Sequence, residues 1–253
     1  MHADFSLFLR KASDTISHKL LLYKLDKLGI RGNAHALIKS YLSNRKQYVS
    51  VLEETSDELS VQYGVPQGSV LGPLLFIIYI NDIHNSTNLG KFVLFADDTN
   101  IFVADKCKTK VFEKANKIME SINIYMRYNL LHINIKKCCY MQFKPGNKET
   151  PVDDGLLNLL LGQNVIKRVY ETKFLGVIID DKLNWEPHLK YLNSKLKCEV
   201  GKLNRMKYVI PKELYKNLYH TLFESHLGYG ITVWGGVTKK KLEPIFITQK
   251  KCV

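Results

Sequence analysis

The stretch from Lys91 to Val103 constrains the fold most, because it places two adjacent carboxylates between two apolar runs. The residue types of both runs favour β-strands, so we predict a buried hairpin with Asp97 and Asp98 at its turn. Two anions this close repel each other, and divalent cations relieve the repulsion. The turn is therefore a candidate two-metal site for phosphoryl transfer, which needs a third carboxylate from another strand because its metals lie about 3.5–4 Å apart. The alternative is a solvated Asp-Asp turn.

Apolar residues at helical spacing predict helices in the rest of the chain. Their periodic positions are Leu21, Leu25 and Leu28; Leu37, Ile38, Tyr41 and Leu42 after Asn33 as N-cap; Phe112, Ala115, Met119, Ile122 and Met126; Leu189, Leu192, Leu196, Val200 and Leu203; and Leu214, Leu218 and Leu222. The segment Asp4–Ile16 is consistent with a strand followed by a turn. Strand character lies at Gln47–Leu52, Leu59–Tyr63, Cys139–Phe143 and Lys167–Ile179, the last with a bend at Gly176. The segment Gly64–Pro73 predicts a loop that lets another backbone approach closely and that leads into a buried helix at Leu74–Ile80.

Charge and periodicity divide the chain into two parts. From Lys182 onward there are fourteen Lys and Arg residues against five Glu, a net charge of +9. The whole chain carries +13, which leaves +4 for residues 1–181. This part shows helical periodicity only and is predicted to be an all-α region that binds a polyanion, with a soluble lysine-rich surface as the alternative. The part before it is predicted to be α+β, an antiparallel sheet with packed helices. We place the domains at 1–181 and 182–253.

Cysteine usage and hydropathy exclude several classes of protein. The five cysteines are odd in number and show no C-x-x-C spacing, which disfavours zinc and a disulfide framework. The sequence has no apolar run that would span a bilayer and no signal-peptide pattern. We therefore expect an intracellular protein, nuclear or cytoplasmic and not secreted, without a membrane partner.

Four motifs follow one another along the chain. They are Asp14-Thr-Ile-Ser-His18 with the leucines after it; Gly64-Val-Pro-Gln-Gly-Ser-Val-Leu-Gly-Pro73; Phe95-Ala-Asp-Asp98, followed by Phe174-Leu-Gly-Val177, Leu183-Asn-Trp185 and His188; and Gly228-Tyr-Gly-Ile-Thr-Val-Trp234. In this order and spacing they resemble the reverse transcriptase domain of non-LTR, LINE-type retrotransposons. The resemblance covers nearly the whole chain.

The resemblance implies a right-hand polymerase, with a palm and a remnant of the fingers at 1–181 and a thumb-like region at 182–253. Asp97 and Asp98 match the catalytic, metal-binding pair. Gln67 and Gly68 match the loop that lies against the incoming nucleotide and the template base. Lys137 matches a catalytic lysine near the leaving pyrophosphate, with a solvated surface lysine as the alternative.

The first motif departs from the family pattern, which is Asp, three residues, Ala, an aromatic residue and Asp. Counting back from Asp14 places Ser13 at the aromatic, nucleotide-contacting position and Phe8 at the catalytic Asp. Asp4 matches the opening of the motif, and is the candidate third metal ligand, only if four residues are inserted. The other interpretation is that residues 7–12 correspond to the strand of the family's first motif, from which an Asp-Leu pair has been deleted. We expect the chain to be truncated at its N-terminus, with the fingers segment missing.

The resemblance leads to two functional hypotheses. The first is an RNA-directed DNA polymerase that uses Mg²⁺ or Mn²⁺, an RNA template, a DNA primer and deoxynucleoside triphosphates. The second is a non-catalytic nucleic-acid-binding remnant of such an enzyme. Because the first motif is altered, we expect this copy to be impaired or inactive as an enzyme.

Overall fold

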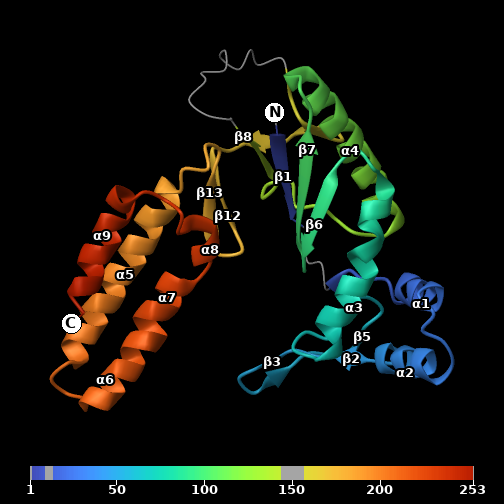
Figure 1. Ribbon diagram of the computed structural model, residues 1–253. Helices are drawn as coiled ribbons and strands as arrows, with labels where there is room; N and C mark the ends of the chain where they lie inside the picture. The colour runs from blue at the N-terminus through green and yellow to red at the C-terminus, as the bar shows by residue number, and fades with distance from the viewer. Residues whose placement is uncertain (1, 9–13, 144–156, 253) are drawn as a thin grey trace. The chain divides into compact units, whose positions relative to one another are not determined.

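The hairpin expected around Asp97 lies in the first of two units into which the chain divides. A computed structural model describes residues 2–8, 14–143 and 157–252, the first of these ranges by its backbone alone (Figure 1). One unit runs to Gln142 and resumes as far as Arg168, and the other contains Phe143 and the residues from Val169 onward. Strand β13 (Val177–Asp180) lies in the second unit because it packs on helix α5 (Glu186–Met206), and the domain boundary expected at 181–182 stays a prediction.

A five-stranded sheet, in the order β11-β8-β1-β7-β6, forms the centre of the first unit. The strands are β1 (His2–Phe8), β6 (Lys91–Phe95), β7 (Asp98–Ala104), β8 (Cys139–Phe143) and β11 (Lys167–Arg168). Strand β7 pairs antiparallel with β1 on one edge and with β6 on the other, whereas β11 pairs parallel with β8. The strand that follows the two carboxylates is therefore held on both edges.

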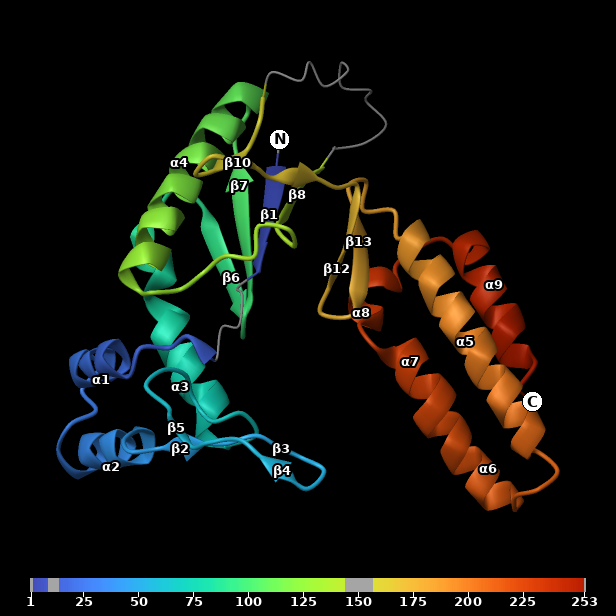
Figure 2. The ribbon, with the colours of Figure 1, turned by 180° about the vertical axis from the view of Figure 1, so that it is seen from behind.

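Helix α4 (Lys108–Tyr128) covers one face of this sheet, and it runs beside β6 and β7 in both views (Figure 1, Figure 2). Its apolar residues at spacings of three and four are buried, as the sequence predicted. On β7, Ile101 and Val103 are buried whereas Phe102 and Ala104 are exposed, because alternate side chains of a strand point to opposite faces. Helix and strand share one hydrophobic core, which confirms the predicted packing.

Further helices and short strands complete the first unit. They are α1 (His18–Lys27), α2 (Gly32–Leu42), β2 (Lys46–Gln47), β3 (Ser50–Val51), β4 (Glu54–Thr55), β5 (Leu59–Ser60), α3 (Leu71–Ile80), the 3₁₀ helix η2 (Asn81–Ser86), β9 (Leu160–Leu161) and β10 (Asn164–Val165). Helix α2 begins at Gly32 after Arg31, so Asn33 is not its N-cap. The Lys24 ammonium donates to the Tyr79 carbonyl at 2.6 Å and to Asp82 Oδ1 at 2.7 Å, and it thereby joins α1 to α3 and η2.

The second unit combines one hairpin with a set of helices. Strand β12 (Glu171–Phe174) pairs antiparallel with β13, and the bend predicted at Gly176 is the turn between them. The helices after α5 are α6 (Lys212–Leu218), which continues through the π-helical segment η3 (Tyr219–Glu224) into α7 (Ser225–Gly228), then α8 (Ile231–Trp234) and α9 (Lys239–Lys250). The predicted apolar face of α5 is buried, and α9 packs against that helix.

Of the helices in the described ranges, none has the length and the apolar character that crossing a bilayer requires.

Candidate active site

The turn between β6 and β7 presents the two carboxylates. Phe95 and Asp98 form the last pair of the hairpin, so Ala96 and Asp97 make a two-residue loop. Ala96 has a φ of 51°, which is the left-handed conformation that such short hairpin loops require. Asp97 is exposed and Asp98 is half-buried. The predicted hairpin is thus present, but Asp98 begins strand β7 instead of lying in the turn.

Strand β1 brings position 8 to this turn. In the antiparallel register the Cα atoms of Phe8 and Asp98 are partners, so Asp98 has Phe95 on one neighbouring strand and Phe8 on the other. Counting back from Asp14 had placed Phe8 where the reverse transcriptase pattern has its catalytic Asp. The register therefore puts the position of the missing carboxylate directly opposite Asp98.

The same register argues against Asp4 as the third metal ligand. Asp4 is paired with Phe102, and all seven residues from His2 to Phe8 are paired in sequence, so none of them loops out. Four residues of extended chain place Asp4 about 13 Å along the strand from position 8. Ser13, the other first-motif candidate, lies outside the described residues.

Electrostatic interactions couple Asp98 to its surroundings. Partial burial and the adjacent Asp97 carboxylate raise the pKa of Asp98, whereas the positive charge of Lys137 lowers it. Lys137 ends the turn that precedes β8, where its backbone N–H donates to the Asn134 carbonyl at 3.0 Å. The lysine singled out in the sequence therefore lies near enough to Asp98 to lower the pKa of that carboxyl.

Replacing Lys137 with Ala is expected to raise the pKa of Asp98 further, because the cation that favours the carboxylate is removed. Titration of the carboxyl carbon by NMR would measure the change. Lys136→Ala removes the same charge from the neighbouring exposed position and is the matched control. An equal pKa in Lys137→Ala and the unaltered chain would contradict the proximity.

The residues at the turn fit a divalent cation only in part. Carboxylate oxygens are the ligands that Mg²⁺ and Mn²⁺ prefer, and Asp97 and Asp98 each offer two of them. Across the described residues, however, no group of three His, Cys, Asp or Glu side chains comes together. A two-metal site needs ligands from a second element, and Phe8 at that position has none to offer.

The glycine-rich loop predicted to approach other backbone closely does so at Gly64. A Cβ atom on Gly64 would lie 2.8 Å from the Asp14 carbonyl oxygen, and the residue has a φ of +83°. The Gly64 N–H donates to the Ile16 carbonyl at 2.8 Å, and the Gly64 carbonyl lies 2.7 Å from His18 Nε2. Glycine is required here because the loop rests on the backbone just before α1.

Replacing Gly64 with Ala is expected to cost about 2–4 kcal/mol of unfolding free energy, since both the backbone strain and the clash with Asp14 oppose it. Gly29 has a similar φ of +87° but open space around it. Gly29→Ala should therefore cost only about 1–2 kcal/mol. Denaturant unfolding of both variants measures the difference, and equal losses would show that the contact with Asp14 is unimportant.

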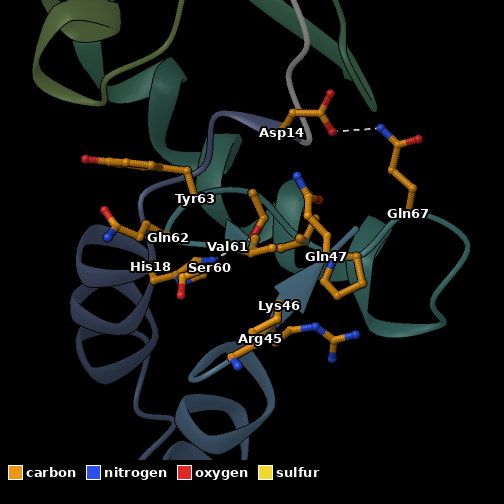
Figure 3. A pocket seen from close by; sticks show the side chains of 13 residues that line it. Asp14, His18, Arg45, Lys46, Gln47, Ser60, Val61, Gln62, Tyr63 and Gln67 are labelled. Carbon is orange, nitrogen blue, oxygen red and sulfur yellow. Dashed lines mark hydrogen bonds between the residues drawn. The ribbon is translucent and has the colours of Figure 1, made fainter. Parts of the chain in front are cut away.

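A pocket of about 640 Å³ lies beside this loop (Figure 3). The Gln67 amide donates to Asp14 Oδ1 at 2.7 Å at one side of the pocket, and Arg45 and Lys46 lie on another. Gly68, next to Gln67, has a φ of +77° and open space beside it. The described residues that line this pocket do not include Asp97 or Asp98.

Sequence reasoning identified Gln67 but missed the two cations near it. Lys46 begins β2 and Arg45 precedes it, and Lys46 forms an ion pair with Glu58 at 3.0 Å. They reach the pocket because β2 pairs with β5, which leads into the Gly64 loop. A basic pair in a strand-like stretch carries no local signal of this placement, because the contacts that create it are remote in sequence.

Comparison with known families gives one match over most of the chain. Residues 5–179 match the family described as reverse transcriptase (RNA-dependent DNA polymerase). The RNA-directed DNA polymerase from mobile element jockey is 25% identical over 257 residues in Drosophila melanogaster and 27% over 258 residues in Drosophila funebris. Each alignment covers 97% of this chain and 27% of the relative, so the chain spans about a quarter of those proteins.

Solved structures with a similar fold include two telomerases. The apo telomerase from Candida tropicalis matches with a TM-score of 0.53 and 11% identity, over 99% of this chain and 50% of the telomerase. The telomerase from Candida albicans, solved with a TWJ fragment of telomeric RNA, matches with a TM-score of 0.50 and 12% identity, over 99% of this chain and 43% of the telomerase. At these identities the likeness shows a shared polymerase fold and nothing finer.

Proposed function

The chain belongs to the reverse transcriptase family, in the branch of the non-LTR retrotransposons, and we propose that it is the polymerising domain of an RNA-directed DNA polymerase. Its nucleotidyl-transfer centre is the β6–β7 turn, the first unit is the palm and the second unit is the thumb. The observation that carries the proposal is the carboxylate pair on a hairpin held beside β1, with Lys137 near enough to influence Asp98.

The proposal assigns a role to each of Asp97, Asp98 and Lys137. Asp97 and Asp98 would hold the divalent metal, and Lys137, whose charge favours the ionised form of Asp98, would meet the negative charge of the leaving pyrophosphate. Bound Mg²⁺ or Mn²⁺ supplies the chemistry that a protein side chain lacks, a lowered pKa of the primer 3′-hydroxyl and stabilisation of the leaving group.

The Gln67 loop positions the incoming nucleotide and the template base. The hydrogen bond to Asp14 fixes the Gln67 amide. Gly68 has no side chain, and the space beside it is open. In the neighbouring pocket, Arg45 and Lys46 are suited to phosphate, because oxygen anions form strong charge-assisted hydrogen bonds with them.

This copy is expected to polymerise slowly, because Phe8 stands where a metal-binding carboxylate is needed. The same observation favours a second candidate function, a non-catalytic nucleic-acid-binding remnant of a reverse transcriptase. Only the polymerase adds nucleotides to a primer, whereas both candidates bind nucleic acid.

Primer extension on an RNA template, with Mg²⁺ or Mn²⁺ and deoxynucleoside triphosphates, separates the candidates. We expect slow incorporation that Asp97→Ala abolishes and that Asp57→Ala, at an exposed carboxylate elsewhere in the first unit, leaves unchanged. Incorporation that survives Asp97→Ala would refute the proposed centre. Binding of the RNA–DNA hybrid without any incorporation would favour the remnant.

Binding of an RNA–DNA hybrid is expected to depend on salt and not on base sequence, since fourteen Lys and Arg residues follow residue 181 and phosphates carry no sequence information. Between low and physiological salt, the affinity should fall by about tenfold or more. Fluorescence anisotropy with two unrelated hybrids at several salt concentrations measures both properties. A salt-independent affinity would contradict a phosphate-binding thumb.

A further inference from the structure

A cavity of about 450 Å³ lies at the C-terminal end of α4, and none of its lining residues belongs to the β6–β7 turn. We call it the Arg127 pocket. The last turns of α4, the segment 131–135 and the β9–β10 hairpin line it. The Asn116 side chain holds this hairpin on α4, because it accepts from the Leu160 N–H at 2.9 Å and donates to the Asn158 carbonyl at 3.1 Å. The walls of the pocket are therefore fixed by contacts within the first unit.

The Arg127 pocket combines an apolar floor with a basic rim. Met126, Leu131 and Leu161 line it with buried side chains, whereas Arg127 and His132 line it with exposed ones. No carboxylate is among the described residues of the lining. Within the described ranges, neither Arg127 nor His132 forms an ion pair. Since an arginine stays charged, the pocket suits an apolar side chain that has a carboxylate beside it.

The β3–β4 hairpin of the same unit presents that combination at its tip. Val51 and Glu54 form its last pair, so Leu52 and Glu53 make a two-residue loop. Leu52 is 99% exposed, and both glutamates are exposed as well. Among the described residues, neither Glu53 nor Glu54 has an ion-pair partner. The tip, which we call the Leu52 tip, is thus one apolar side chain followed by two unpaired carboxylates.

The Leu52 tip is poorly stabilised by its own chain. Leu52 has a φ of 55°, a left-handed conformation that is unfavourable for a residue with a Cβ atom. Every residue from 43 to 60 is exposed, and a two-stranded hairpin without a packed face is only marginally stable. Burial of Leu52 against another surface would offset both costs. In both views the β3–β4 hairpin lies away from α4, so the tip and the pocket do not meet within one chain (Figure 1, Figure 2).

We propose that the Arg127 pocket binds the Leu52 tip of a second copy of this chain. Leu52 enters the apolar floor, and the carboxylates of Glu53 and Glu54 face Arg127 and His132. The tip and the pocket are different surfaces, so the contact is heterologous, and each associated pair keeps one free tip and one free pocket. A single hairpin tip buries little surface, and the association is therefore weak and reversible.

Sedimentation velocity of the full chain, freed of nucleic acid, tests this self-association without any need for polymerisation. The mean sedimentation coefficient is expected to rise between about 1 and 100 μM protein. Leu52→Ser removes the apolar anchor, and Arg127→Glu reverses the charge that meets the carboxylates, so each should weaken association by about tenfold or more. Leu37→Ser, at an exposed leucine of α2, and Lys117→Glu, at an exposed lysine of α4, are the matched controls. We expect them to change the affinity by less than about twofold.

A mixture of the two impaired variants tests the direction of the contact. The Leu52→Ser copy keeps an intact pocket, and the Arg127→Glu copy keeps an intact tip. Together they are expected to form a dimer of one copy of each and no larger species, with an affinity within about threefold of that of the unaltered chain. This recovery would also show that both variants are folded. An unaltered chain that stays monomeric, association that either variant leaves unchanged, equal losses in the controls, or a mixture that stays monomeric would overturn the proposal.

Discussion

Replacing Phe8 with Asp is expected to raise RNA-templated primer extension by about 100-fold or more over the unaltered chain. The register places position 8 opposite Asp98, so the new carboxylate completes a ligand set drawn from two strands. Metal stabilisation of the charge that develops in phosphoryl transfer is worth several kcal/mol, and each 1.4 kcal/mol or so is tenfold in rate. Initial rates of extension with Mg²⁺ and with Mn²⁺ measure the gain.

Ser6→Asp is the matched control for that substitution. Position 6 lies on the same strand, two residues away, and its register partner is Asn100. Residues two apart point to the same face of a sheet but are displaced by about 7 Å, which is beyond the reach of one metal site. A comparable gain in Ser6→Asp would mean that the register of β1 does not determine activity. No gain in Phe8→Asp would refute the third-ligand position.

The largest loss of stability is expected from Trp234→Ala in the second unit. Trp234 is 1% exposed, its indole N–H donates to the Tyr229 carbonyl at 3.0 Å, and its ring centroid lies 5.5 Å from that of His188. Removing a buried Trp side chain leaves a cavity and costs about 3–5 kcal/mol. Denaturant unfolding measures the loss, and Trp185, the other of the two tryptophans, reports it by fluorescence.

Tyr208→Ala removes an aromatic side chain of the same unit that is 90% exposed, and it should change stability by no more than about 0.5 kcal/mol. A similar stability of Trp234→Ala and Tyr208→Ala would show that the indole is not part of the core that joins the C-terminal motif to α5.

The elements predicted best from the sequence are those with a strong local pattern. Helix α4 and helix α5 follow from long apolar faces, and β8 has the predicted bounds Cys139–Phe143. The elements on which a strand packs are harder to predict. The hairpin of β12 and β13 belongs with the helices after it because β13 packs on α5, and strand character alone does not indicate which neighbour a strand will choose.

The candidate site shows the same contrast. The carboxylate pair is visible in the sequence because its flanking strands are strongly apolar. Counting back from Asp14 directed attention to Phe8, but only the register with β7 shows that Phe8, and not Asp4, is paired with Asp98. The hydrogen bond between Gln67 and Asp14 joins segments 53 residues apart, and no local pattern encodes such a contact.

Manganese titration followed by electron paramagnetic resonance tests the central claim most directly, because the signal of free Mn²⁺ disappears on binding. We expect Phe8→Asp to bind Mn²⁺ about tenfold or more tightly than the unaltered chain, and Phe8→Asp with Asp98→Asn to lose that gain. Equal affinity of the unaltered chain and Phe8→Asp, or an unchanged affinity after Asp98→Asn, would contradict a metal site formed by β1 and the β6–β7 turn.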